Sequence, residues 1–207
     1  AADGDYAGST AAYSKLLEFD PDNARLYNNR GLAFANSGDL DNAIADYGRA
    51  IELDPDMDTA YYGRANCYID KQDFGSALAD IERSLELCPD DAAAYNIRGL
   101  VHRQQGELDQ AIDDFDRAIA ADPDYCMAYS NRAGCYLQKD DYVCAIRDYE
   151  LARQIDPNDE DTLDWLGIAH ARYGAAVAEA GDIEAGVQRL RLAVKMRPGL
   201  ATAHDLL

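Results

Sequence analysis

Prolines recur at a constant interval along this chain, and that interval limits the folds open to it. They stand at Pro21, Pro55, Pro89, Pro123 and Pro157, each 34 residues after the one before. A fixed period of about 20 to 50 residues is the signature of stacked repeat architectures. The sequence therefore predicts a series of similar units, each ending at a proline.

Within each unit, residues of the same size recur at spacings of three and four, which is the period of a helix face. One column is always small: Gly31, Ala65, Gly99, Ala133 and Gly167. A later column is always large: Tyr47, Ile81, Phe115, Tyr149 and Leu190. Small residues let a neighbouring helix approach closely, so each unit is predicted to contain two packed helices.

A turn signal separates the two helices of each unit. Gly38-Asp39 is the first example, and Gln72-Asp73 stands at the same place one unit later. Glycine adopts the left-handed conformation that ends a helix, and the acid after it favours the start of the next. The proline that closes the unit ends the second helix. Each unit is therefore predicted to be a helical hairpin.

This pattern resembles the tetratricopeptide repeat family, and the resemblance runs from Gly4 to the last residue. One departure is that the first large position, usually Trp in the family, is Tyr here, as at Tyr27 and Tyr61. The resemblance implies an all-α fold, a right-handed superhelical α-solenoid of tetratricopeptide hairpins. It also implies a protein-interaction scaffold.

The whole chain, 1–207, is expected to form a single solenoid. Its parts are a half repeat at 4–23, repeats at 24–57, 58–91, 92–125 and 126–159, an extended repeat at 160–200, and the start of a further helix at 201–207. Because the chain opens on a second helix and closes on the start of a first, we expect a longer parent protein.

The fifth unit contains seven additional residues, since Pro198 follows Pro157 by 41 residues. Seven residues are about two helical turns, so the insertion preserves the buried face. The first helix is predicted to run unbroken from about Asp161 to Ala180 and to extend roughly 10 Å beyond its neighbours. A kink or short loop at Gly174 is the alternative.

An arginine occupies the seventh place of four units, and an aspartate follows it by sixteen residues. A half-buried cation requires a partner, so we expect an ion pair in each of these hairpins that fixes the angle between the helices. The fifth unit has Leu166 and Arg189 instead. The expected pairs are Arg30 with Asp46, Arg64 with Asp80, Arg98 with Asp114, and Arg132 with Asp148.

In a stack of such hairpins, the first helices line an inner, concave surface where a partner would bind. This face is rich in side-chain amides, which suit the backbone of an extended peptide because they both donate and accept. Trp165 and Tyr62 are candidate anchors. A merely hydrated wall is the alternative. The candidate groove residues are Arg25, Asn28, Asn29, Tyr62, Asn66, Asn96, Arg103, Asn131, Gln138, Trp165 and Arg172.

Family members that capture a chaperone's C-terminal carboxylate use a clamp of two Lys, two Asn and one Arg on this face. The lysine positions of that clamp are occupied here by Asn28, Tyr62 and Asn96. The clamp is therefore absent from this sequence.

Charge excludes several classes of partner. The chain has 19 Lys and Arg against 39 Asp and Glu, a formal charge of −20. Phosphate-backbone binding needs clustered cations, so no nucleic-acid partner is expected. No apolar run approaches the roughly 20 residues that span a bilayer, so no membrane insertion is expected. Five scattered cysteines favour a reducing compartment, and we expect a cytoplasmic location.

No catalytic or metal-binding motif is evident in the sequence. His102 and His170 share one column with Phe34 and Tyr68, so we expect both to replace a packed aromatic residue. Neither has a second ligand one turn away, and the cysteines form no Cys-x-x-Cys pair. No catalytic residue, no metal and no cofactor is predicted, and the chain is not expected to be an enzyme.

The leading function is therefore a scaffold that binds a peptide or helix of a partner protein in the concave groove. One alternative is a self-assembly module, a homo-oligomer that docks through its open ends or its long fifth first helix. Another is the targeting arm of a larger protein whose other domain is missing.

Overall fold

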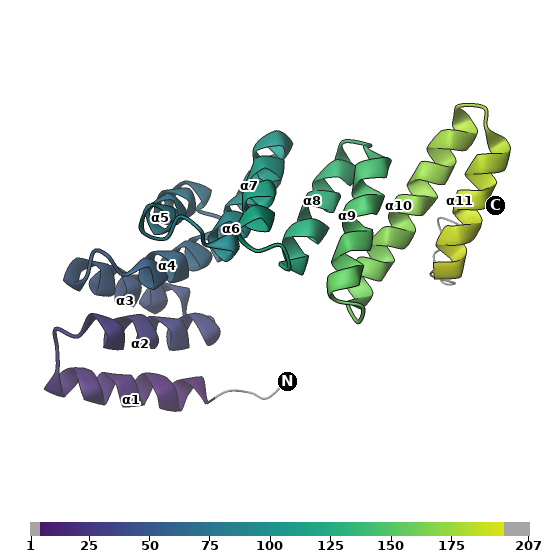
Figure 1. Ribbon diagram of the computed structural model, residues 1–207. Coiled ribbons are helices and arrows are strands. Elements are labelled where there is room, and N and C mark those ends of the chain that lie inside the picture. The colour runs from purple at the N-terminus through teal and green to yellow at the C-terminus, as the bar shows by residue number, and fades with distance from the viewer. Residues whose placement is uncertain (1–4, 197–207) are drawn as a thin grey trace. The chain divides into compact units, whose positions relative to one another are not determined.

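The computed structural model describes residues 5–196, which form eleven α-helices and no strand. The expected all-α fold class is confirmed. The chain divides into two compact units, Ala1–Val101 and His102–Leu207, with the division inside α6. The helices are labelled in Figure 1: α1 (Tyr6–Phe19), α2 (Ala24–Asn36), α3 (Leu40–Leu53), α4 (Asp58–Asp70), α5 (Phe74–Leu87), α6 (Ala92–Gln104), α7 (Leu108–Ala121), α8 (Cys126–Gln138), α9 (Tyr142–Ile155), α10 (Glu160–Glu179) and α11 (Ile183–Met196).

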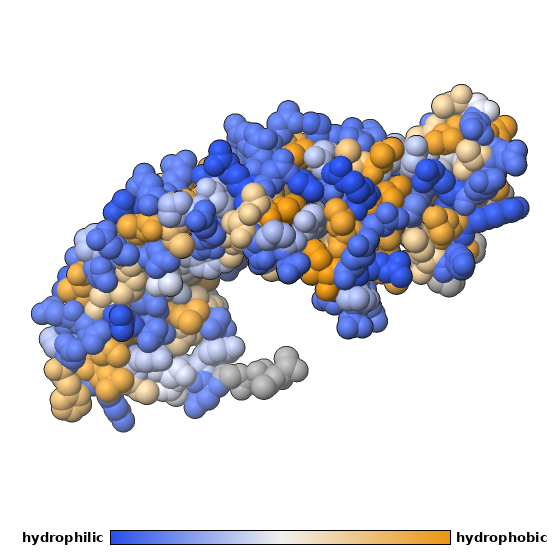
Figure 2. Space-filling model, in the orientation of Figure 1, coloured by the Kyte–Doolittle hydropathy of each residue, from blue (hydrophilic) through white to orange (hydrophobic). Residues whose placement is uncertain are grey.

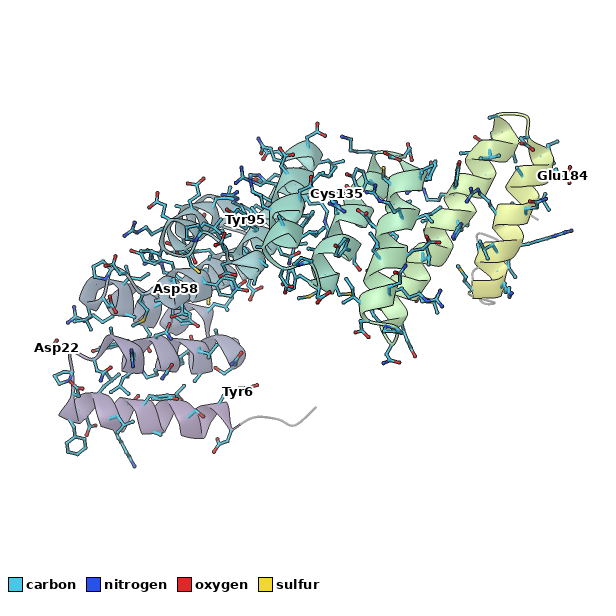
Figure 3. All side chains as sticks on the ribbon, viewed as in Figure 1. Tyr6, Asp22, Asp58, Tyr95, Cys135 and Glu184 are labelled. Carbon is cyan, nitrogen blue, oxygen red and sulfur yellow. The ribbon has the colours of Figure 1, made fainter. Side chains whose placement is uncertain are left out.

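Each predicted repeat contains the expected pair of helices. Repeat 24–57 holds α2 and α3, and repeat 126–159 holds α8 and α9. Short connections join the helices, with Asp22 before α2 and Asp58 as the first residue of α4 (Figure 3). The single solenoid over 1–207 stays a prediction. The further helix expected at 201–207 lies outside the described residues.

The turn inside each hairpin requires a positive φ at one position. Gly38 and Gly181 supply it with φ of 82° and 104°, which costs glycine little. Gln72 and Asp140 adopt it as well, with φ of 60° and 58°. The repeat geometry therefore overrides the preference of these two side chains for negative φ.

An aspartate then caps the second helix in most hairpins. Asp39 accepts a hydrogen bond from the backbone N–H of Asn42, and Asp73 accepts one from that of Ser76. Asp141 does the same for Cys144. These bonds satisfy backbone donors that have no partner inside the helix, so the acid of the turn signal fixes where the helix begins.

Small residues let the helices of a hairpin cross closely. A Cβ at Gly31 would lie 3.1 Å from the ring of Tyr47 and 3.3 Å from the carbonyl oxygen of Ala43. Ala43 and Ala50 are fully buried in the same cluster. Packing of this kind holds α2 against α3 and sets which residues of the two helices face each other.

The expected ion pairs within α2–α3, α4–α5 and α8–α9 are bidentate. Arg30 donates through Nε and Nη2 to both carboxylate oxygens of Asp46, at 2.6 and 2.7 Å. Arg64 makes the same two bonds to Asp80, both at 2.7 Å. The pairing of Arg98 with Asp114 joins residues of different units and stays a prediction.

The third of these pairs is the most deeply buried. Arg132 donates to Asp148 at 2.6 and 3.0 Å, and the Asp148 side chain is fully buried. Each arginine also lies over the tyrosine three residues before it, with Arg30 5.5 Å from the ring centroid of Tyr27. The cation is therefore held between a carboxylate and an aromatic face.

The long first helix of the fifth unit is confirmed. α10 runs without a break from Glu160 to Glu179, seven residues longer than α8, or about 10 Å. Its first half belongs to the preceding hairpin, because Leu166 and Ala169 are buried in a cluster with Ala133 and Tyr149. Its second half packs on α11.

The insertion shifts which residues of α10 face α11. A Cβ at Gly174 would lie 2.9 Å from the carbonyl oxygen of Gly186 and 3.0 Å from Leu190, so Gly174 occupies the place that Gly31 has in the first hairpin. Tyr173 likewise replaces the arginine of the ion pair, with Arg189 4.0 Å from its ring centroid. Gly174 is therefore the closest point of the crossing and not a kink.

Substituting Gly174 tests this crossing. Alanine normally stabilises a helix by about 1 kcal/mol relative to glycine, but at position 174 its Cβ would press on backbone. We expect Gly174→Ala to destabilise the protein by about 1 to 3 kcal/mol. Gly48→Ala in α3 is the matched control, since its Cβ would meet only Arg64 at 3.5 Å, and it should raise the melting temperature. Stabilisation by Gly174→Ala would contradict the crossing.

Removing one partner of an ion pair tests the cost of the buried charge. Asp80→Ala leaves Arg64 without its carboxylate, and the Arg64 side chain is only 22% exposed. We expect a loss of about 2 to 4 kcal/mol in urea unfolding, somewhat below a fully buried pair. The double variant Arg64→Met, Asp80→Leu should recover most of it. A double variant less stable than Asp80→Ala would mean that the ion pair stabilises the protein more than the apolar residues that replace it.

Candidate functional site

Two pockets occupy the same repeat position, one in each unit. Both lie between consecutive first helices, and a tyrosine from a second helix lines each of them, Tyr47 from α3 and Tyr149 from α9. Both tyrosines are 2% exposed. Their rings are therefore core residues whose outer ends reach the pockets.

The N-terminal pocket has a volume of about 470 Å³ and lies between α2 and α4. Its wall carries amides and a large exposed apolar residue, Leu32, which is 51% exposed. The amide of Asn66 donates to the carbonyl oxygen of Tyr62 at 3.2 Å. The lining residues are Asn28, Leu32, Ala35, Asn36, Tyr47, Thr59, Tyr62, Gly63, Asn66, Cys67 and Asp70.

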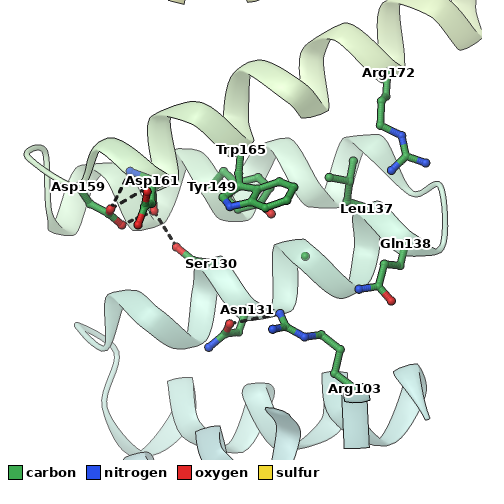
Figure 4. Close-up of a pocket in the computed structure, with 12 residues that line it drawn as sticks. Arg103, Ser130, Asn131, Leu137, Gln138, Tyr149, Asp159, Asp161, Trp165 and Arg172 are labelled. Atoms are coloured by element: carbon green, nitrogen blue, oxygen red, sulfur yellow. Dashed lines mark hydrogen bonds between the residues drawn. The ribbon is translucent and has the colours of Figure 1, made fainter. Parts of the chain in front are cut away.

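The C-terminal pocket has a volume of about 440 Å³ and lies mainly between α8 and α10. The indole of Trp165, which is 50% exposed, stands at its centre in Figure 4. Asp159 and Asp161 lie to one side of the indole and Arg172 to the other (Figure 4). The lining residues are Arg103, Ser130, Asn131, Gly134, Leu137, Gln138, Tyr149, Asp159, Asp161, Thr162, Trp165 and Arg172.

At two repeat positions, one pocket has a glycine where the other has a large side chain. Leu32 of the N-terminal pocket corresponds to Gly134, and Gly63 corresponds to Trp165. A Cβ at Gly63 would lie 2.8 Å from the hydroxyl of Tyr47, so that hydroxyl packs directly beneath α4. In the C-terminal pocket the glycine lies on α8 instead, and the indole covers the opposite side.

The acidic side of the C-terminal pocket is held in place by the start of α10. Asp159 accepts hydrogen bonds from the backbone N–H groups of Asp161 and Thr162, at 3.1 and 3.3 Å. The Thr162 hydroxyl donates to Asp159 at 2.5 Å and lies 2.9 Å from the Ser130 hydroxyl. Asp159 therefore acts first as a helix cap.

Two arginines line this pocket, and only one of them is paired with a carboxylate among the described residues. Arg172 donates to Asp140 at 3.0 Å and lies 5.8 Å from the ring centroid of Tyr142. Arg103 donates to the neutral amide oxygen of Asn131 at 3.3 Å. Within residues 5–196, no carboxylate lies at ion-pair distance from Arg103. Its charge is therefore available to a ligand.

Both pocket tyrosines are protonated at neutral pH, as tyrosine ordinarily is, and burial raises their pKa further. Burial raises the pKa of Tyr149 to about 12, although the nearby charge of Arg103 acts in the opposite direction. Burial also raises the pKa of Tyr47. Both hydroxyl groups can therefore donate a hydrogen bond at neutral pH.

Most of the candidate groove residues line a pocket. Asn28, Tyr62 and Asn66 line the N-terminal pocket, and Arg25, Asn28 and Asn29 line a neighbouring one of about 390 Å³. The C-terminal pocket collects the remaining candidates with one exception: Arg103, Asn131, Gln138, Trp165 and Arg172.

Asn96 is the exception and corrects one expectation about the groove face. The residue is 3% exposed, so its amide is enclosed by the protein itself and is not presented to a partner. Its place on the first helix matched that of Tyr62, which lines a pocket. Helix position alone therefore did not determine exposure on this face.

Sequence reasoning did not identify Tyr47, Tyr149, Gly63 and Gly134 as pocket residues. The two tyrosines stand in a column that reads Ile, Phe or Leu in the other units, so they resembled core residues. One available signal was a hydroxyl in a column that is otherwise apolar, because a buried tyrosine hydroxyl needs a partner. The exchange between Leu32 and Gly134 could also have been read from the alignment.

Comparison with family models decides what kind of chain this is. Models described as tetratricopeptide repeat match residues 24–57, 62–125 and 98–160, and one described as TPR repeat matches residues 1–38. The chain belongs to the tetratricopeptide repeat family. No curated protein sequence matches it.

Solved tetratricopeptide structures share the fold at low sequence identity. YrrB, described as a TPR protein with an unusual peptide-binding site, is 22% identical, with a TM-score of 0.73 over 94% of this chain and 96% of its own. MamA is 26% identical, with a TM-score of 0.69 over 76% and 92%. PilF of Pseudomonas aeruginosa is 16% identical, with a TM-score of 0.75 over 98% and 89%.

Tetratricopeptide repeats build extended binding surfaces, so a general role as a protein-interaction scaffold is supported. In the described part of the chain, no group of three His, Cys, Asp or Glu side chains could hold a metal ion. Burial raises the pKa of Cys67 and of Cys135 to about 11, which keeps both thiols protonated. None of the described helices is long and apolar enough to cross a bilayer.

The expectation that His170 replaces a packed aromatic residue is consistent with its surroundings. The residue is 3% exposed, and neither ring nitrogen has a hydrogen-bond partner within residues 5–196. Burial, aided by the charge of Arg189, lowers the pKa of His170 to about 4. The fold therefore holds this imidazole in its neutral form.

His170 should make the stability of this tetratricopeptide protein pH-dependent. A histidine has a pKa of about 6.5 in the unfolded chain. Its contribution is therefore complete above pH ~6.5 and is lost as the pH falls toward ~4, with about 2 kcal/mol lost at pH 5. His170→Phe should lose less stability than the natural protein between pH 7 and pH 5 in urea unfolding. Equal losses would mean that His170 is not buried as a neutral side chain.

Proposed function

We propose that the chain binds a peptide segment of a partner protein along the face formed by its first helices. The observation that carries this proposal is the recurrence of one pocket type in both units. Each pocket combines a buried tyrosine with amides and an exposed large apolar residue, Leu32 or Trp165. Amides and tyrosine hydroxyls suit a peptide backbone, and the apolar residue suits a side chain.

The polar groups of the N-terminal pocket favour a main-chain ligand in extended form. The oxygen of the Asn28 amide is buried and has no hydrogen-bond partner in the described part of the chain. An orphan acceptor of this kind is costly unless a ligand or water satisfies it. A backbone N–H of a bound strand can do so once the Asn28 side chain rotates to turn this oxygen toward the pocket, whereas a helical ligand has already used most of its own N–H groups.

The family supports the same reading. YrrB, whose fold this chain shares, is described as having an unusual peptide-binding site. The sequence of this chain lacks the residues of the two-lysine clamp, so its ligand does not depend on that clamp. The affinity should come from main-chain hydrogen bonds together with contacts to Leu32 and Tyr62 in the N-terminal pocket, or to Trp165 in the C-terminal pocket.

Selected peptides test the proposal. Peptides should be selected by phage display against the whole chain, and their affinity measured for Asn66→Ala and Trp165→Ala. Loss of a hydrogen bond or an aromatic anchor should weaken binding about tenfold or more. Glu82→Ala, on the exposed face of α5, is the control and should leave affinity unchanged.

Equal loss in all three variants, or no loss in any, would exclude the first-helix face as the binding surface. Light scattering across protein concentration should accompany the measurement. A stable dimer whose formation quenches the fluorescence of Trp165 would favour self-assembly over peptide binding.

A further inference from the structure

Arg103 differs from three arginines that pair with an aspartate inside a hairpin. Arg30, Arg64 and Arg132 each make a bidentate pair with an aspartate. Arg103 is partly buried, yet the acceptor that it meets is the neutral amide oxygen of Asn131. In a chain with twice as many acids as bases, a partly buried cation without a carboxylate retains its attraction for an anion.

Tyr149 provides a second hydrogen-bond donor at the same pocket. The residue is 2% exposed and lines the C-terminal pocket. Its hydroxyl makes no hydrogen bond to a residue within 5–196, and it is not among the buried polar atoms, so it reaches the pocket, where a ligand can accept a hydrogen bond from it. The group is protonated at neutral pH, so it can donate a hydrogen bond to an acceptor in the pocket.

Gly134 brings these two donors to one place. A Cβ at position 134 would lie 3.2 Å from Nη1 of Arg103 and 3.8 Å from the hydroxyl oxygen of Tyr149. Both donors therefore converge on the same bare stretch of α8, where no side chain separates them. Figure 4 shows the Arg103 guanidinium beneath this stretch of α8 and the Tyr149 ring behind Trp165.

We infer that Arg103 and Tyr149 form a subsite for the carboxylate of an Asp or Glu side chain in the bound peptide. This inference rests on the proposed function and names the residue class that the C-terminal pocket selects. A carboxylate offers two acceptor oxygens, one for each donor. The exposed indole of Trp165 offers apolar surface to the neighbouring side chain.

The surroundings favour a single negative charge. Asp159 and Asp161 line the same pocket, so a phosphate with nearly two charges meets more repulsion than a carboxylate. The N-terminal pocket offers the internal comparison: no Lys or Arg is among its lining residues, and Asp70 stands where Arg172 stands in the C-terminal pocket. The acid-selective subsite is therefore specific to the C-terminal pocket and uses none of the lysine positions of the family's clamp.

Trp165 is the chain's sole tryptophan and reports directly on this pocket. The probe is an acetylated and amidated hexapeptide of alanine with one central Glu-Phe pair, titrated against the whole chain while the fluorescence of Trp165 is followed. Peptides with Gln or phosphoserine in place of Glu are the comparison. Because charged hydrogen bonds add about 1.5 to 3 kcal/mol, the Glu peptide should bind about 10 to 100 times more tightly than the Gln peptide.

Two variants assign the preference to its donors. Tyr149→Phe and Arg103→Met should each reduce the ratio of Glu to Gln affinity to within about threefold. Tyr149→Phe removes no internal hydrogen bond, so its melting temperature should stay close to that of the natural protein. Arg153→Met, at an exposed position of α9, is the matched control and should preserve the ratio.

Equal affinity for the Glu and Gln peptides would overturn the subsite while leaving the peptide-binding face intact. A full preference for Glu in Tyr149→Phe and Arg103→Met, or the absence of any Trp165 response to the Glu peptide, would overturn it as well. Tighter binding of the phosphoserine peptide would replace it with a phosphopeptide site. Failure of the peptide-binding face itself would appear separately, as unchanged affinity of selected peptides for Asn66→Ala and Trp165→Ala.

Discussion

The close crossing of two helices within a hairpin is the constraint on which the other features depend. It requires a small residue on the first helix, as the 3.1 Å approach of Tyr47 to Gly31 shows. Once that contact is fixed, residues sixteen apart face each other, so Arg30 meets both oxygens of Asp46. The same contact directs Tyr47 between two first helices, where its outer end becomes part of a pocket. Packing and the candidate site therefore have a common origin.

The fifth hairpin shows how firmly that crossing is maintained. Seven inserted residues keep the helix face but displace every column relative to α11. The protein restores the crossing with Gly174 and Gly186, and fills the place of the ion pair with Tyr173 and Arg189. Helix extent was predictable, because two turns preserve a face whatever residues they contain. The new contacts between α10 and α11 were not predictable. An alignment counted from the proline assigns Gly167 to the crossing, whereas the position of α11 selects Gly174.

The candidate site was predictable to the extent that it depends on helix face. Asn66, Asn131 and Trp165 were expected on the first-helix face and line pockets there. Asn96 shares that face but is enclosed, since exposure depends on neighbouring side chains that the period of one helix does not describe. The role of Tyr149 in the pocket could not be predicted from the sequence, for a different reason. Its ring satisfies the packing pattern, and only three-dimensional contacts show that its hydroxyl has no acceptor within the described residues.

Because the chain is strongly acidic, it is unusual that Arg103 has no carboxylate partner among the described residues. With twenty more acids than bases, most partly buried arginines are held by a carboxylate of their own. At physiological ionic strength charges interact over about 8 Å. The net charge of the chain therefore repels a distant acidic peptide only weakly, and the groups beside the bound peptide decide its position. An arginine kept beside a neutral amide, with a protonated hydroxyl next to it, preserves a short-range site for one carboxylate in an otherwise repulsive surface. Recognition would then depend on a single well-placed acid and not on the overall charge of the partner.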